Sequence, residues 1–275
     1  MAAFGLDLSG NKLTDEGVKE LASLTNLRWL KLSGTAVTDE GLKELKGLKN
    51  LQWLGLGFTK VSDAGVKELA SLESLQFLDL ENSHVTGTGL TELNTLRWLY
   101  LGGSHVTDAG LNGLGQLKNL QWLSLGATPV TDAVLQQLSG LENLQTLYLS
   151  GAQVTDAGLQ ELAGLKSLQT LSLFHTKVTD TGLKELAELK NLQTLELDFL
   201  PVTDAGLQQL SGLTSLHSLS LEKTEITDAG LKELTGLMNL QLLYVGGTKI
   251  TEAGLIELRK ALPECKISQQ TRFAG

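Results

Sequence analysis

Leucine recurs along the chain at a fixed interval, and the polar positions between the leucines repeat with it. Aligned on the central leucine of each unit, successive positions are 24 residues apart, except for 21 residues between Leu78 and Leu99. The series runs through Leu30, Leu54, Leu78, Leu99, Leu123, Leu147, Leu171, Leu195, Leu219 and Leu243, with Leu6 before it and Ile267 after it. A fixed period of this length predicts a solenoid, in which each unit stacks on the next.

The pattern inside one unit predicts a strand, a turn and a short helix. Leu30 and Leu32 alternate with polar or aromatic residues, which is the period of a strand with one buried face. Thr38 suits a helix N-cap, and Asp39 places negative charge at the helix N-terminus. We expect Gly47 to end the helix in a left-handed conformation. A helix of about two turns is not stable alone, so stacking must bury its apolar side.

This motif, L-x-x-L-x-L-x-x-[T/N]-x-V/I, resembles the leucine-rich repeat family over nearly the whole chain. The recurring Val-Thr-Asp-Ala-Gly-Leu segment is similar to the helix-bearing subtype of bacterial repeat arrays and of F-box proteins, although the chain has no F-box segment. The resemblance implies an α/β solenoid curved into a horseshoe, with a parallel β-sheet on the concave face and short α-helices on the convex face. The family's usual Asn or Cys after the strand is here mostly threonine, whose hydroxyl can bond to the turn backbone.

The repeat predicts a single domain over residues 1–275 with about twelve units. The first unit, about residues 1–24, is incomplete, and residues 262–275 are expected to form a closing strand and cap. The unit from Leu75 to Leu96 has lost three residues and carries Gly87 in place of the usual Asp, which predicts a shorter convex segment. The uncapped N-terminal edge is a candidate surface for self-association.

Charge and composition narrow the classes of function. The net charge of −9 argues against nucleic acid and against an anionic membrane surface, because both need a basic face. The sequence shows neither a signal peptide nor an apolar stretch long enough for a transmembrane segment. The single cysteine, Cys265, excludes an internal disulfide. These features predict a cytoplasmic protein or a soluble domain excised from a longer chain.

All four tryptophans occupy one column of the repeat, beside the central leucine. The column contains Trp29, Trp53, Phe77, Trp98 and Trp122. Its members point away from the buried leucines, so they are expected on the concave face, where five strand positions span roughly 19 Å. Tryptophan is enriched in binding hot spots. The column therefore predicts a binding strip, and the same strip is a second candidate surface for self-association.

Other concave positions add candidates for binding. Tyr100 and Tyr148 would supply contact area and hydroxyl groups, and Lys31, Asp79 and Glu81 would set register and specificity. The remaining candidates are Phe174, Glu196, Asp198, Glu222 and Tyr244. Like charges on Glu196, Asp198 and Glu222 are mildly unfavourable at strand spacing. The sequence allows two interpretations of these acids: a solvated acidic surface, or a site that a basic partner group neutralises.

These patterns predict a non-enzymatic module that binds a protein or peptide in its concavity. One alternative is recognition of a glycan or small ligand, because flat rings stack on sugar faces. Another is a structural or consensus-designed scaffold, in which neighbouring rings stack and only stabilise the fold. No catalytic motif is present, and we expect no cofactor and no metal. His84 and His105 occupy equivalent positions and are expected to stack at the rim, without a third ligand.

Overall fold

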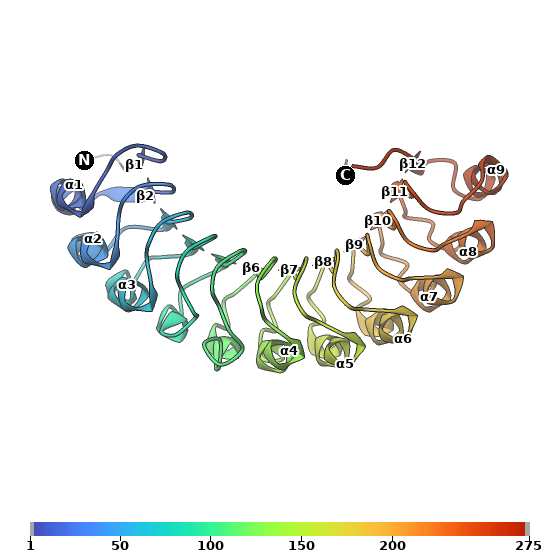
Figure 1. The fold of residues 1–275 in the computed structure, drawn as a ribbon, viewed down its shortest axis with the longest axis horizontal. Helices are drawn as coiled ribbons and strands as arrows, with labels where there is room; N and C mark the ends of the chain where they lie inside the picture. Colours follow the sequence, from blue (N-terminus) through green and yellow to red (C-terminus); the bar gives the residue numbers. More distant parts are fainter. Residues whose placement is uncertain (1–2, 273–275) are drawn as a thin grey trace. The chain divides into compact units, whose positions relative to one another are not determined.

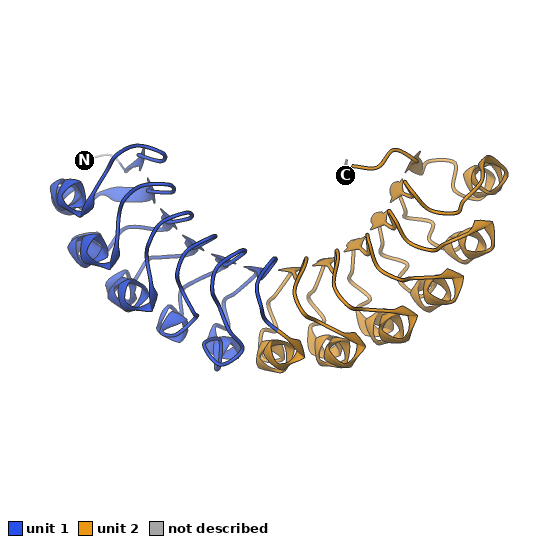
Figure 2. Cartoon of the chain, in the orientation of Figure 1, with its two compact units in different colours: residues 1–130 blue, residues 131–275 orange. Residues whose placement is uncertain are grey.

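The computed structural model describes residues 3–272. The chain divides into two compact units, residues 1–130 (unit 1) and residues 131–275 (unit 2), which Figure 2 shows in two colours. In each unit the strands lie on one side and the helices on the other (Figure 1). We call the side of each sheet that faces away from the helices its strand face. The predicted α/β architecture is therefore confirmed in both units.

Unit 1 contains a parallel sheet in which each strand pairs with the next one along the chain. Its strands are β1 (Phe4–Asp7), β2 (Leu27–Lys31), β3 (Trp53–Gly55), β4 (Phe77–Asp79), β5 (Trp98–Tyr100) and β6 (Trp122–Ser124). Its α-helices are α1 (Asp15–Lys19), α2 (Asp39–Lys43) and α3 (Asp63–Glu68). Its 3-10 helices are η1 (Glu20–Ser23), η2 (Glu44–Gly47), η3 (Leu69–Ser71), η4 (Leu90–Glu92) and η5 (Leu114–Gln116).

Unit 2 repeats this arrangement with parallel pairing between successive strands. Its strands are β7 (Thr146–Tyr148), β8 (Thr170–Ser172), β9 (Thr194–Glu196), β10 (Ser218–Ser220), β11 (Leu242–Tyr244) and β12 (Lys266–Ser268). Its α-helices are α4 (Asp132–Leu138), α5 (Asp156–Leu159), α6 (Asp180–Leu183), α7 (Asp204–Leu210), α8 (Asp228–Leu231) and α9 (Glu252–Ala261). Its 3-10 helices are η6 (Gln160–Gly164), η7 (Lys184–Glu188) and η8 (Lys232–Leu234).

The leucines of the repeat form the core between strands and helices. Leu30 and Leu32 of the second repeat are fully buried, as are Leu42 and Leu45 on its helical side. Burying one such side chain stabilises the fold by about 1.5–3 kcal/mol. Because every repeat supplies the same leucines at the same places, the core continues from one repeat to the next.

The N-terminal residue of most helical segments is bonded to an aspartate of the preceding repeat. The Asp15 carboxylate accepts hydrogen bonds from the Thr38 backbone N–H and hydroxyl, both at 2.8 Å. The same pair of bonds joins Asp39 to Ser62, Asp63 to Thr86, Asp132 to Thr155, Asp156 to Thr179, Asp180 to Thr203, Asp204 to Thr227 and Asp228 to Thr251. We call this set of bonds the Asp–Thr ladder. It gives the aspartates a role between repeats, in addition to their favourable position near a helix N-terminus.

The glycine three residues after the capping threonine makes room for this ladder. A Cβ atom on Gly41 would lie 2.6 Å from the Asp15 Oδ1 atom, well inside van der Waals contact. Thr38 also caps α2 as predicted, because its hydroxyl accepts a hydrogen bond from the Glu40 N–H. The conformation predicted for Gly47 is wrong: its φ is not positive, and the turn closes with the Leu48 N–H donating to the Leu45 carbonyl.

The helical side is thinner where the repeat is irregular. Between α3 and α4 the described elements on this side are the short 3-10 helices η4 and η5. Gly87, which replaces the usual Asp, has a φ of +111°, and the Thr107 N–H donates to the Thr86 carbonyl instead of to a carboxylate. The shorter segment predicted for this repeat is therefore present, and the repeat after it lacks an α-helix too.

The residue three positions after the end of each strand from β1 to β11 has a positive φ, in the left-handed region. Five of these positions are glycine: Gly10, Gly34, Gly103, Gly151 and Gly247. The others are Phe58, Asn82, Ala127, His175, Phe199 and Lys223. Glycine occupies this region without strain, whereas a bulky residue there is unfavourable. Three aromatic residues, Phe58, His175 and Phe199, thus adopt a φ that is unfavourable for their side chains.

Candidate functional site

The aromatic column of unit 1 lies on neighbouring strands in register. Trp29 pairs with Trp53, and Trp53 pairs with Phe77. The series continues from Phe77 to Trp98 and from Trp98 to Trp122. Trp29 is 40% exposed, and the other four rings are partly exposed. The sheet therefore brings all five side chains together on one strand face.

The rings do not stack one on another along the whole column. Trp53 and Phe77 stack with ring centroids 4.3 Å apart. The contacts then pass to Tyr100 of the next column, which lies 5.1 Å from Phe77 and 5.8 Å from Trp122. Trp29 and Trp98 take part in none of the ring contacts described in unit 1. The interpretation of the column as one continuous stack is thus wrong.

Glycines allow two of the indoles to lie flat on the sheet. A Cβ atom on Gly5 would fall within the Trp29 ring, so this ring lies over β1. A Cβ atom on Gly55 would lie 2.8 Å from the Trp53 ring, which leans along its own strand. The Lys31 ammonium is 5.5 Å from the centre of the Trp53 ring, within the range of a cation–π interaction. The Trp29 ring therefore covers β1, and the Trp53 ring lies between its own strand and the Lys31 ammonium.

Two adjacent hollows open between these rings. One has a volume of about 440 Å³ and is lined by Gln52, Trp53, Gln76, Phe77, Trp98, Tyr100 and Trp122. The other, of about 450 Å³, is lined by Arg28, Trp29, Lys31, Gln52 and Trp53. Trp53 and Gln52 line both hollows and separate them. We call the residues of the two hollows the aromatic surface.

An acidic pair lies on the strand face of unit 1, in the columns beside the rings. The Asp79 side chain occupies the space above Gly57, and its carboxylate accepts a hydrogen bond from the Glu81 N–H at 2.9 Å. Burial raises the pKa of Asp79, against the lowering effect of that hydrogen bond. Burial, and the nearby charge of Asp79, raise the pKa of Glu81. A positive charge placed here would favour the ionised forms of both groups.

The remaining candidates lie on unit 2, where the interpretation of a solvated acidic surface is wrong for Asp198 and Glu222 but is not contradicted for the partly exposed Glu196. Asp198 and Glu222 are fully buried, and Arg272 of the same chain forms ion pairs with both. The Arg272 guanidinium also lies 4.1 Å from the centre of the Tyr244 ring. The basic group that these acids require thus comes from the C-terminal segment of this chain.

Tyr148, Glu196 and Phe174 are partly exposed on the same strand face. Burial raises the pKa of the Tyr148 hydroxyl, and the charge of Glu196 raises it further. The Phe174 ring contacts the edge of Phe199 at 5.3 Å, and His175 lies 6.2 Å from Phe199. These rings form a small cluster at the turns that follow β8 and β9, separate from the acids that Arg272 neutralises.

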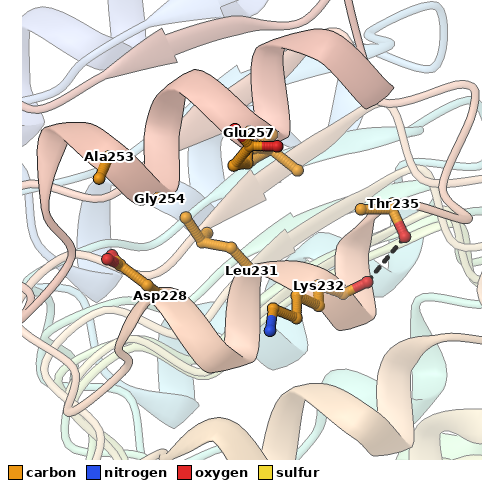
Figure 3. Close-up of a pocket in the computed structure, with 8 residues that line it drawn as sticks. Asp228, Leu231, Lys232, Thr235, Ala253, Gly254 and Glu257 are labelled. Atoms are coloured by element: carbon orange, nitrogen blue, oxygen red, sulfur yellow. Dashed lines mark hydrogen bonds between the residues drawn. The ribbon is translucent and has the colours of Figure 1, made fainter.

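A third hollow, of about 420 Å³, lies on the helical side of unit 2 between α8 and α9 (Figure 3). Its polar wall includes Asp228, whose carboxylate already accepts both Thr251 hydrogen bonds, which hold its pKa below the ordinary value. The hollow exists because Ala253 and Gly254 carry little or no side chain where α9 faces α8. We interpret it as a groove between ladder-linked helices.

Other reactive groups are dispersed. His84 and His105 stack at 5.4 Å, as predicted. Within residues 3–272, no group of three or more His, Cys, Asp or Glu side chains is arranged to hold a metal ion. Burial raises the pKa of the Cys265 thiol to about 11, which makes it a poor nucleophile at neutral pH. In the same described range, no helix has the length and apolar character needed to cross a membrane.

The repeated strands, the ladder and the open strand face define a solenoid repeat protein. A family profile described as "Leucine-rich repeat region" matches residues 61–253, and one described as "Leucine Rich repeat" matches residues 6–22 and 23–46. The chain belongs to the leucine-rich repeat family. A search of curated proteins gives no significant match.

Solved structures share the fold. Internalin inlF of Listeria monocytogenes is 23% identical with a TM-score of 0.65, and the match covers 99% of this chain and 87% of that one. Internalin C2 (inlC2) of the same organism is 29% identical with a TM-score of 0.57, over 75% and 84% of the two chains.

A plant receptor has an ectodomain of similar fold. It belongs to the membrane receptor kinase GASSHO1/SCHENGEN3 of Arabidopsis thaliana and was solved in complex with Casparian strip integrity factor 2. The identity is 21% and the TM-score is 0.62. The match covers 95% of this chain but only 35% of the receptor chain.

Proposed function

We propose that this chain is a non-enzymatic binding module whose aromatic surface on unit 1 binds a protein or peptide. The observation that carries the proposal is the pair of hollows of about 440 and 450 Å³, which share Trp53 and are lined by partly exposed rings. Such hollows fit side chains of a partner, and tryptophan and tyrosine are the residue types most often found in binding hot spots.

Ring stacking accounts for part of the aromatic column. Of the four neighbouring pairs in that column, Trp53 and Phe77 are described in ring contact, and Phe77 and Trp122 each contact Tyr100. An aromatic pair contributes about 0.5–1.5 kcal/mol beyond the area it buries, so the three contacts together contribute about 1.5–4.5 kcal/mol. Trp29 and Trp98 take part in none of the described ring contacts, so the exposed area of Trp29 and the hollow beside Trp98 are left for a different role.

The polar neighbours indicate the chemistry of the partner. Asp79 and Glu81 have raised pKa values, and a basic side chain between them would favour their ionised forms. The rings favour apolar or aromatic side chains. We therefore infer a partner segment that places apolar side chains in the hollows and a lysine or arginine against the acidic pair.

The structural comparisons support this proposal at the level of the fold. The plant receptor ectodomain was solved together with a second molecule, Casparian strip integrity factor 2. The low identity limits that likeness to the architecture, so the residues that would bind are argued from this chain alone.

The test is selection of binding peptides from a random display library on the full-length protein. The selected peptides are then measured by fluorescence anisotropy against the wild type and Trp53→Ala/Trp98→Ala. We expect the double variant to weaken binding by at least tenfold, because truncation of a hot-spot residue costs more than about 1–2 kcal/mol. The same peptides should be enriched in basic residues beside apolar ones.

The matched control is Thr170→Ala/Thr194→Ala, which changes the same column of the repeat on β8 and β9. It should leave binding unchanged, and melting curves must show that both variants fold. Equal binding by wild type and the tryptophan variant would refute the proposal. A glycan array tests the alternative ligand class. If wild type binds sugars and the tryptophan variant does not, the ligand of the aromatic surface is a glycan rather than a peptide.

A further inference from the structure

The last described residues of the chain cross the strand face of unit 2. After β12, residues 269–272 turn back over β11. A Cβ atom on Gly246 would lie 2.8 Å from the Thr271 backbone nitrogen and 2.9 Å from the Gln270 carbonyl carbon. The absence of a side chain at this one position therefore lets the segment lie directly on the sheet.

Arg272 combines ion pairs, hydrogen bonds and a cation–π contact on the strand face. Its Nε donates to Glu222 Oε1 at 2.9 Å, and its backbone N–H donates to Glu222 Oε2 at 2.9 Å. Its terminal nitrogen donates to Asp198 Oδ2 at 3.1 Å and to the Ser220 hydroxyl at 2.5 Å. Its planar face covers the Tyr244 ring at 4.1 Å. An ammonium group cannot reproduce this fork and stacked plane.

Hydrogen bonds from Ser220 and Glu222 orient the Asp198 carboxylate, in addition to its contact with Arg272. Asp198 Oδ1 accepts hydrogen bonds from the Ser220 hydroxyl and from the Glu222 N–H, which orient its second oxygen. Burial raises the pKa of Asp198, while those two bonds and then the Arg272 charge lower it. Removing the guanidinium would leave two buried carboxylates side by side, so the site has a strong preference for a cation.

The described hydrogen bonds that attach this segment to the body of unit 2 are concentrated on Arg272, through its side chain and its backbone N–H. Residues 269–272 are exposed as whole residues and contain no helix or strand. Within the described part of the segment, the hydrogen bonds to the body of unit 2 are those of Arg272. By contrast, β12 is held by three register pairs with β11.

We propose that Asp198, Ser220, Glu222 and Tyr244 form an arginine-binding site, that Arg272 occupies it in cis, and that an extended peptide carrying arginine competes for it. The two carboxylates and the tyrosine ring bind the arginine side chain, and Glu222 also accepts a hydrogen bond from the arginine backbone N–H. The net charge of −9 also favours approach of a basic peptide. This site is on unit 2 and is independent of the aromatic surface.

The experiment uses full-length protein and a fluorescein-labelled peptide with the sequence of residues 268–275, Ser-Gln-Gln-Thr-Arg-Phe-Ala-Gly. Binding is measured by anisotropy for wild type, Arg272→Ala and Arg272→Lys. We expect Arg272→Ala to bind the peptide at least tenfold more tightly than wild type, because its site is vacant. Arg272→Lys should be intermediate, since lysine retains the charge and loses the fork.

The matched control is Arg259→Ala, which removes another unit 2 arginine whose ion pair with Glu252 is exposed. It should bind the peptide no better than wild type. A peptide with alanine or lysine in place of arginine should bind Arg272→Ala at least tenfold more weakly. Glu222→Gln added to Arg272→Ala should abolish binding of the original peptide.

Any of the following results would overturn the proposal. One is an Arg272→Ala protein that melts cooperatively but does not bind the peptide, which would make the contact purely structural. Another is equal binding by wild type and Arg272→Ala. If Arg272→Ala does not fold, the comparison of Arg272→Lys with wild type decides, and the absence of any gain in affinity overturns the proposal. Loss of binding in Trp53→Ala/Trp98→Ala would place the peptide on the aromatic surface instead.

Discussion

Gly41→Ala tests whether the Asp–Thr ladder holds the repeats together. In an ordinary helix this change stabilises by about 0.5–1 kcal/mol, because alanine loses less backbone entropy. Here the new Cβ atom would lie 2.6 Å from Asp15 Oδ1, 3.1 Å from the Val37 Cγ1 atom and 3.4 Å from the Asp15 Cα atom. We therefore expect the opposite sign, a loss of stability.

The size of the loss follows from the geometry. Asp15 Oδ1 must move by roughly 0.8 Å to reach ordinary contact, which stretches a 2.8 Å hydrogen bond from the Thr38 N–H beyond its useful range. Losing a hydrogen bond to a charged group costs about 1.5–3 kcal/mol, and overpacking alone costs about 1–3 kcal/mol. The two losses add to about 2.5–6 kcal/mol, so after subtraction of the helix gain of about 0.5–1 kcal/mol we expect Gly41→Ala to lower the free energy of unfolding by about 1.5–5.5 kcal/mol.

The assay is urea unfolding followed by circular dichroism, with Gly47→Ala as the matched control in the same repeat. A Cβ atom on Gly47 would meet only the Ala22 carbonyl oxygen, at 3.7 Å, so this change should be neutral or slightly stabilising. Gly41→Ala is then repeated in an Asp15→Ala background, which removes the obstructing carboxylate. If the loss stays above about 1.5 kcal/mol there, the collision with Asp15 is not its cause and the reasoning fails.

Three further predictions concern single residues. The pKa of Asp79 is raised above its ordinary 3.8, so the ionised form of this side chain destabilises the fold at neutral pH. Asp79→Asn should therefore raise Tm at pH 7. That gain in Tm should vanish as the pH falls towards 3, where Asp79 is protonated in both the folded and the unfolded state. With a pKa of about 11, Cys265 is only ~0.1% thiolate at pH 8, so native protein should react with a disulfide reagent about 100-fold slower than urea-unfolded protein; equal rates would contradict its burial. Phe58 has a φ of +57° and is 65% exposed, so Phe58→Gly should keep or raise the unfolding free energy, while β-branched Phe58→Val should lower it by about 1 kcal/mol in the same urea assay.

The strands, the core and the strand-face columns could be predicted from the sequence because the same pattern of apolar and polar positions recurs in each repeat. Leu30 and Leu32 determine which side of β2 is buried, and the 24-residue period transfers that choice to the other strands. The pairing of Trp29 with Trp53 follows directly from the same alignment. A period can thus fix backbone register and the side on which each residue points.

Ring orientation and turn geometry could not be predicted in this way. Which neighbour a ring contacts depends on its rotamer and on the space beside it, so Phe77 contacts Tyr100 in the next column rather than continuing the stack to Trp98. The expectation for Gly47 failed because a 3-10 turn ends these helices without a left-handed residue. The Asp–Thr ladder was missed because its bonds join residues 23 positions apart, whereas the sequence argument for Asp39 considered only its own helix.

The repeat predicts where the two acidic pairs lie, but it does not predict which group neutralises them. The sequence places Asp198 and Glu222 side by side and leaves open whether water or a basic group neutralises them. It does not show that Arg272, 74 and 50 residues away, supplies the cation, because that residue lies outside the periodic region. On unit 1, Asp79 and Glu81 are also adjacent acids with raised pKa values. Among the described side chains no lysine or arginine forms an ion pair with either of them. The chain thus satisfies one acidic pair internally and leaves the other beside the aromatic surface, which is why we expect a basic group on the partner that binds there.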